Sequence, residues 1–254
     1  MEPVYSPGLL FILDWDNTLI PSKWLETKGF RLSLYDGGTG STPEMISVCE
    51  SIAPHVAALI NSAKRYGRVV ILTNATKSWV ELGCSLFMPS ILNLIMSLPM
   101  ISAADIYGDL FEDPMRWKEL AFQREIVDLG VRAIVSIGDG EPERNAALNL
   151  GMIRPILVKS LKFMDNPTPE ILLKQLEGTV KAMHMLATCE TPLDIMWLAS
   201  EFVTKEDPFD EILNRPLEVT SGDPNLPPKK SAPSSKPARS PTPKPRYDFL
   251  DTVE

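Results

Sequence analysis

Short apolar runs, each followed by a polar residue, alternate with helical patterns over the first two-thirds of this 254-residue chain. Three runs are rich in Leu, Ile and Val, at residues 9–13, 68–72 and 133–137, and two weaker candidates lie at 156–158 and 103–107. Continuous runs of this kind are typical of strands buried on both faces, and strands that alternate with helices form parallel sheets. The chain is therefore predicted to be an α/β protein, a three-layer Rossmann-like parallel sheet with helices on both faces.

The expected helices begin at a common signal, a capping Thr or Asp followed by Pro. We expect the first to run to about Arg65 with a break before Pro54, and the second to run to Leu129. The last has a capping-box spacing that ends at Asp194. The four start signals are Thr42-Pro43, Asp113-Pro114, Thr168-Pro169 and Thr191-Pro192.

Composition divides the chain into three parts. Residues 1–165 form the predicted α/β domain, and residues 166–206 are expected to form an extension of two helices packed on it. Residues 207–254 form a Pro/Lys-rich tail, in which the stretch 224–246 holds eight Pro, six basic residues and no acidic residue. Such a stretch buries too little apolar surface to fold, so we expect a disordered tail.

Charge and cysteine content limit the partners and the compartment. The whole chain has a net charge of −8, and the part outside residues 224–246 has −14, which disfavours binding to nucleic acid. Three scattered cysteines indicate a reducing compartment. The N-terminal residues have no basic segment before their apolar run, and the most apolar window, residues 87–106, is interrupted by two prolines. We therefore expect a cytoplasmic protein with no membrane contact.

Polar side chains gather where the predicted strands end. Ligands of open parallel sheets bind outside the carboxyl ends of the strands, so these residues are expected to share one edge of the sheet. Lys118 lies in the first turns of the helix that leads into the third strand. The residues that directly follow strands are Asp14 and Asp16, Thr73 and Asn74, and Asp139.

The chemistry of this set indicates a phosphoryl pocket that contains Mg²⁺. Carboxylates that converge at one edge repel each other unless a cation lies between them, and an all-oxygen set with few protein ligands suits Mg²⁺. Lys118 adds a positive charge. Thr73 and the free N–H groups of a helix expected to start at Asn74 add donors for phosphate oxygens.

These residues resemble the four ordered signature motifs of the haloacid dehalogenase (HAD) superfamily, over roughly residues 8–160. The motifs are Asp14-x-Asp16-x-Thr18 after a strand, a strand-terminal Thr73, Lys118, and Gly138-Asp139-x-x-x-Glu143. Any one of them is common by chance, whereas four in this order, each on the expected element, are specific.

The resemblance implies a role for each position. Asp14 would be the nucleophile that forms an aspartyl-phosphate, and Asp16 the general acid and base. Thr73, Asn74 and Lys118 would bind the phosphoryl group. Mg²⁺ would take the Asp14 carboxylate, the Asp16 backbone carbonyl and Asp139. The implied activity is hydrolysis of phosphate monoesters.

Two positions depart from the family pattern. Asn17 stands where many relatives have Gly, which is a mild change because Asn tolerates unusual backbone angles. Glu143 stands where the last motif usually has a second Asp. Its longer side chain either reaches the metal through water or belongs to the surface of the following helix, and the sequence leaves both open. Lys118 likewise has the alternative of an ordinary surface lysine.

The spacing of the motifs also bears on the substrate. Residues 19–41 are only large enough for a flap, and 44 residues separate Thr73 from Lys118. We therefore expect a capless or minimally capped enzyme, which in this family suggests a phosphorylated protein or another bulky substrate, although a small molecule stays open. The tail contains forms of an SH3 ligand and of proline-directed kinase sites, so contacts of either type are candidates.

Two other classes of protein share part of this residue pattern. An interaction module that keeps the scaffold without useful catalysis is the alternative function, although it has no chemical need for the site residues. A two-component receiver domain also uses an acidic Mg²⁺ pocket with Thr and Lys. It is excluded by motif order, because Asp139 follows both Thr73 and Lys118.

Overall fold

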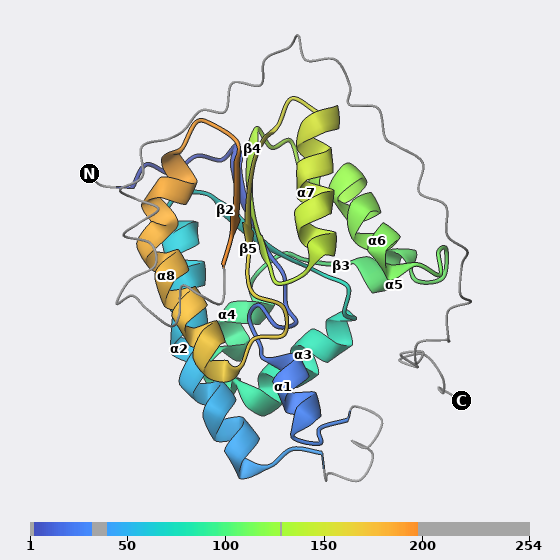
Figure 1. The fold of residues 1–254 in the computed structure, drawn as a ribbon, viewed down its shortest axis with the longest axis vertical. Helices are drawn as coiled ribbons and strands as arrows, with labels where there is room; N and C mark the ends of the chain where they lie inside the picture. The colour runs from blue at the N-terminus through green and yellow to red at the C-terminus, as the bar shows by residue number, and fades with distance from the viewer. Residues whose placement is uncertain (1–2, 32–39, 128, 198–254) are drawn as a thin grey trace, which may run out of the picture. The chain divides into compact units, whose positions relative to one another are not determined.

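The computed structural model describes residues 3–31, 40–127 and 129–197, which belong to the first of two units in the chain, Met1–Arg215. The predicted tail 207–254 and the end of the predicted extension lie outside the described residues. Six parallel strands form one sheet in the order β3-β2-β1-β4-β5-β6 (Figure 1). The strands are β1 Leu9–Leu13, β2 Arg68–Thr73, β3 Met100–Ser102, β4 Ala133–Gly138, β5 Leu157–Lys162 and β6 Leu193–Met196.

Helices cover both faces of this sheet, as predicted. In Figure 1, α2 and α8 lie side by side on one face, and α6 and α7 lie together on the other. The helical elements are α1 Ser22–Thr27, α2 Pro43–Lys64, α3 Lys77–Phe87, the 3₁₀ turn η2 Pro89–Ile91, α4 Leu92–Met96, α5 Ala103–Tyr107, α6 Pro114–Ala121, the π-helical η3 Phe122–Ile126, α7 Glu141–Ile153 and α8 Pro169–Thr188. The predicted three-layer α/β fold is confirmed.

Alternation along the strands builds two separate cores. In β1, Phe11 and Leu13 pack with α2, α3 and α8, whereas Leu10 and Ile12 pack with α5, α6 and α7. Side chains of successive strand residues point to opposite faces, so every residue of a strand covered on both sides is buried. This is why β1 is apolar throughout, with no polar position until Asp14.

The ends of β1 and β4 lie at the point where the strand order reverses. From β1 the chain proceeds outward to β2 and β3, and it then returns to the other side of β1 for β4, β5 and β6. In open parallel sheets the crevice at the carboxyl ends of two such strands is the usual ligand site. Asp14 follows β1 there, and Asp139 follows β4.

Three of the wrong element predictions concern residues 103–107, the Thr191 signal and Pro54. Residues 103–107 form helix α5 rather than a strand, because Ser102 ends β3 and caps the helix by accepting from Asp105 N at 3.0 Å. The Thr191 signal does not start a helix; residues 193–196 form β6, because their backbone pairs with β5. The break predicted before Pro54 is also absent, since α2 is continuous and its buried face packs against α8.

The helix predicted to run from residue 114 to 129 is regular only as far as Ala121 and continues as η3. Gly130, with a positive φ of 65°, ends this segment. Among the described residues, no single helix has the length and apolar character needed to cross a membrane. The pair Lys77–Phe87 and Pro89–Met96 meets those two criteria together, with a bend of 118° between its members.

Candidate active site

The centre of the site is a buried lysine that contacts two carboxylates. Lys118 Nζ, on α6, donates to Asp14 Oδ1 at 2.7 Å and also to Glu143 Oε1, in the first turn of α7. Lys118 is 1% exposed, Asp14 6% and Glu143 8%. The surface alternatives for Lys118 and Glu143 are therefore excluded, and the predicted neighbourhood of Lys118 and Asp14 is observed.

The charges of this cluster do not balance. Burial alone would lower the pKa of Lys118, but the Asp14 and Glu143 carboxylates outweigh it and raise that pKa. Burial raises the pKa of Asp14, and repulsion from Glu143 and Asp139 adds to the effect, which exceeds the opposing attraction of Lys118. The single positive charge of Lys118 cannot neutralise the carboxylates of Asp14, Glu143 and Asp139 together. This excess of negative charge would attract a cation.

Asp139 is held from the side of β5. Its main-chain oxygen accepts from Lys162 Nζ at 2.9 Å, and its Oδ2 accepts from Asn166 N at 3.3 Å. Burial and then repulsion from Glu143 raise the pKa of Asp139 to about 7. The carboxyl group is therefore near its midpoint at neutral pH when only protein groups surround it.

Asp16 lies in a different environment from Asp14. Its Oδ1 accepts from the indole Nε1–H of Trp79 at 3.0 Å. Burial raises the pKa of Asp16, and the Trp79 hydrogen bond lowers it by a smaller amount. Trp15, between the two aspartates, is fully buried in the core that contains the buried residues of α2.

Asn17 turns the chain away from the sheet. Its φ of 56° lies in the left-handed region, which Asn adopts more readily than most residues other than Gly. Its Oδ1 also accepts from Lys23 N at 2.8 Å and from Ser22 Oγ at 3.2 Å, at the start of α1. The side chain therefore orders the segment that follows the two aspartates.

Thr73 ends β2, the neighbour of β1, and is 1% exposed. Its Oγ1 accepts from Ala75 N at 3.0 Å. The prediction that a helix starts at Asn74 is wrong: α3 starts at Lys77, and Thr76 caps it by accepting from Trp79 N at 3.2 Å. Asn74 instead donates from Nδ2 to Pro114 O at 3.0 Å, which ties the end of β2 to the start of α6.

Two glycines make room for Glu143. A Cβ at Gly138 would lie 2.8 Å from Glu143 Cγ and 3.4 Å from Asp14 Cβ, and one at Gly140 would lie 2.5 Å from Glu143 Oε2. Contacts this close require the side chain to move, so the backbone here is shaped around Glu143. Its Oε2 is buried and has no hydrogen-bond partner among the described residues.

The oxygen atoms at this edge of the sheet are ligands of the kind that Mg²⁺ takes. Among the described residues, no group of three or more Asp, Glu, His or Cys side chains is arranged to hold a metal ion. Mg²⁺ does not require such a cage, because it binds through one or two carboxylates and keeps several waters. Asp14 and Asp139 are close enough for repulsion from Asp139 to raise the pKa of Asp14, and a divalent cation between them would relieve that repulsion. The main-chain oxygen of Asp16 stays the third expected ligand. The residues present therefore fit the ion.

Three residues near the site were missed from the sequence. They are Trp79, Asn166 and Lys162, each of which contacts an expected site residue from an element distant in sequence. The Asn166-Pro167 pair is a turn signal shortly after β5, and it could have placed Asn166 at the same edge of the sheet. No local pattern marks Trp79 or Lys162.

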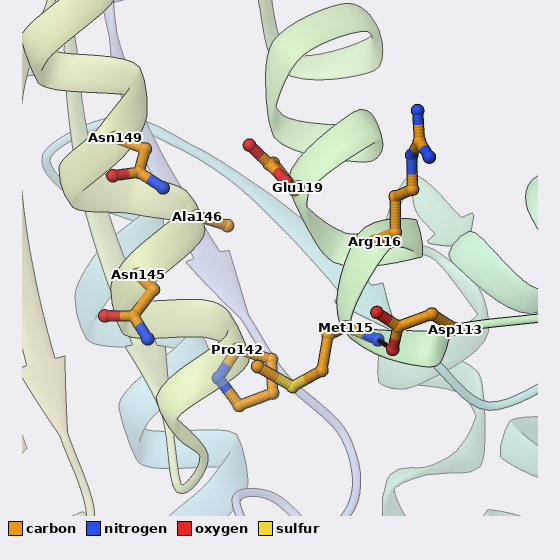
Figure 2. A pocket seen from close by; sticks show the side chains of 8 residues that line it. All are labelled: Asp113, Met115, Arg116, Glu119, Pro142, Asn145, Ala146 and Asn149. Carbon is orange, nitrogen blue, oxygen red and sulfur yellow. Dashed lines mark hydrogen bonds between the residues drawn. The ribbon is translucent and has the colours of Figure 1, made fainter. Parts of the chain in front are cut away.

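A polar groove of about 480 Å³ lies beside the site, between α6 and α7. Figure 2 shows Met115 of α6 reaching toward Pro142 of α7, with Glu119 and Asn149 further along the groove. The same two helices carry Lys118 and Glu143. Comparison of the chain with protein-family models, with curated proteins and with solved structures gave no match.

Proposed function

We propose that this chain is a HAD-like, Mg²⁺-dependent phosphatase, which hydrolyses phosphate monoesters through an aspartyl-phosphate on Asp14. The observation that carries the proposal is the buried contact between Asp14 and Lys118, at the point where the strand order reverses and beside Asp139 and Glu143. A nucleophilic carboxylate beside a fixed ammonium is suited to attack on a phosphorus atom that carries negative charge.

In the first step, an Asp14 carboxylate oxygen attacks phosphorus and the bond to the leaving oxygen breaks. Asp16 donates a proton to that oxygen as it leaves. The raised pKa of Asp16 supports this role, because a general acid must hold its proton at the working pH. Lys118, already in contact with Asp14, is positioned to balance the negative charge of the phosphoryl oxygens.

In the second step, Asp16 takes a proton from water, the water oxygen attacks phosphorus, and the bond to Asp14 breaks. Inorganic phosphate leaves and both aspartates return to their starting states. Thr73 and the main chain after it are the proposed phosphoryl-binding groups at the end of β2. Mg²⁺, held by Asp14, Asp139 and the Asp16 carbonyl, would offset charge on the phosphoryl oxygens.

The proposed substrate is a phosphorylated protein or another bulky phosphate ester, with small molecules as the alternative. The segment between β2 and α6 forms short helices and the edge strand β3, with α5 after it, and among the described residues it adds no further sheet that would close over the site. The three cysteines are free, which supports the proposed cytoplasmic setting.

The test is turnover of a generic aryl phosphate with Mg²⁺ by wild type and Asp14→Asn. Loss of the nucleophile should lower kcat by about a thousandfold or more without unfolding the protein. Asp109→Asn, the same chemical change at an exposed carboxylate, is the matched control and should retain activity. Unchanged turnover in Asp14→Asn contradicts the mechanism. Absence of turnover in wild type on both metabolite and phosphopeptide panels favours the interaction module.

A further inference from the structure

Trp79 contacts the site from a helix that the HAD motifs do not include. It occupies the third position of α3, where its backbone N–H donates to the capping Thr76. Helical side chains lean toward the N-terminus of their helix, so the indole extends back toward the end of β2 and the site. Its Nε1–H reaches Asp16 Oδ1 at 3.0 Å, across 63 residues of sequence.

The Trp79 ring is held on two sides. Phe30 stacks on it, with ring centroids 5.8 Å apart and an angle of 29° between the planes, and Phe87 packs edge-on against Phe30. On the helix itself, a Cβ at Gly83 would lie 3.3 Å from the Trp79 ring, so the glycine leaves the space that the indole fills. A ring fixed in this way presents its N–H group in one direction.

We propose that Trp79 is a positioning residue, whose indole N–H fixes the orientation of the Asp16 carboxyl group so that its other oxygen faces the leaving oxygen of the substrate. An N–H group can only donate, so it occupies an Asp16 oxygen that carries no proton. The transferable proton is thereby directed to the opposite oxygen. This inference rests on the proposed function, because it assigns Trp79 to the acid step of that reaction.

The test compares kcat/KM for two esters that differ in how much they need an acid. 2,4-Dinitrophenyl phosphate has a stable leaving anion, whereas phenyl phosphate requires a proton on its leaving oxygen. Because general acids contribute about a hundredfold or more, Trp79→Phe should lower kcat/KM by about tenfold for phenyl phosphate and by less than about twofold for the dinitrophenyl ester. The parameter kcat/KM isolates phosphorylation of Asp14 from the later hydrolysis.

Two further variants separate positioning from structural damage. Trp117→Phe also removes an indole hydrogen bond, the one to Phe111 O at 2.6 Å, and should affect both esters equally or not at all. In an Asp16→Asn background, Trp79→Phe should have no further effect on the ratio of the two esters, because the acid is already lost. An equal fall for both esters in Trp79→Phe, or no fall, overturns the proposal.

A readout independent of turnover is the indole N–H spectrum of the ¹⁵N-tryptophan-labelled full chain, which has five tryptophans. Asp16→Ala should shift one indole resonance and increase its exchange with solvent, and Asp109→Ala should shift none. This measurement decides the contact even if Trp79→Phe does not fold, and five unchanged resonances in Asp16→Ala overturn the proposal. Failure of the proposed function is recognised separately, because the Asp14→Asn variant would then turn over substrate at the same rate as wild type.

Discussion

Lys118 and Lys159 are each only 1% exposed, and their surroundings shift their pKa values in opposite directions. Lys118 meets two carboxylates, which raise its pKa. Lys159, on β5, is also 1% exposed, but its Nζ donates to the main-chain oxygens of Leu186 and Ala187 at the end of α8. Carbonyl dipoles stabilise an ammonium less than full negative charges do, so burial dominates and lowers the pKa of Lys159.

The lowered pKa of Lys159 predicts that its contribution to stability depends on pH. As pH rises from the lowered value in the folded protein toward the ordinary 10.5, the unfolded chain binds more protons at this lysine than the folded chain does. The free energy of unfolding therefore increases with pH over that window. Wild type should gain stability relative to Lys159→Met as urea unfolding is measured from pH 7 to 10.5. A difference that stays constant or falls contradicts this.

At the residue scale, much of the site could be predicted because most of its residues lie at the end of a strand or directly after it. Asp14 and Asp139 needed only the strand ends and the rule that parallel strands share an edge. Trp79 and Lys162 could not be found in this way, because their contacts with the site depend on how α3 packs and on how the end of β5 lies against Asp139. Such contacts leave no local pattern.

At the scale of elements, α2 shows how packing overrides a local signal. Pro54 lies inside this 22-residue helix and cannot donate a hydrogen bond to residue 50. Its ring is exposed, whereas the neighbouring Ile52, Ala53 and Val56 are buried. Burial of three such side chains contributes several kcal/mol, roughly enough to offset the ~3 kcal/mol cost of an interior proline.

We predict that Pro54→Ala stabilises the protein by about 1–2 kcal/mol. The alanine restores the missing hydrogen bond, and part of this gain is offset because the unfolded chain becomes less restricted. The measurement is the urea midpoint and slope of both proteins. Ala58→Pro, one turn further along the same exposed face, is the matched control and should destabilise by about 3 kcal/mol. A Pro54→Ala protein no more stable than wild type counts against this account.

β6 is a second element in which contacts distant in sequence override a local helix signal. The capping spacing from Thr191 to Asp194 is a real helix pattern, but the backbone of residues 193–196 pairs with β5. Arg144 of α7 reinforces the strand, because its guanidinium donates to both Asp194 oxygens at 2.8 and 2.6 Å. Both partners are distant in sequence, which is why this strand could not be predicted.

At the scale of the whole molecule, the net charge of −8 complicates any test for Mg²⁺. General screening of negative charge by salt also stabilises an acidic protein, so the added ion must be compared with NaCl of equal ionic strength. Bound ligand at about 100 times its Kd stabilises by about 2.7 kcal/mol. Specific binding is therefore measurable above the screening effect.

We predict that Mg²⁺ raises the unfolding midpoint of wild type beyond the NaCl control, and that a chelator reverses the rise. Asp139→Asn should lose most of this specific increase, because it removes one of the two carboxylates that fit the ion. Asp109→Asn, which changes an exposed carboxylate, should keep it. Equal Mg²⁺ shifts in wild type and Asp139→Asn would count against the proposed metal site.

The sheet order also has a consequence for how the chain is made. β1 is synthesised first, but one of its two edges is covered only by β4, which begins at Ala133. At ribosomal rates of 5–20 residues per second, an all-apolar strand therefore waits on the order of 10 s for its second partner. During that interval the unpaired edge of β1 can pair with strands of other nascent chains, so chaperones matter most to this protein while it is being synthesised.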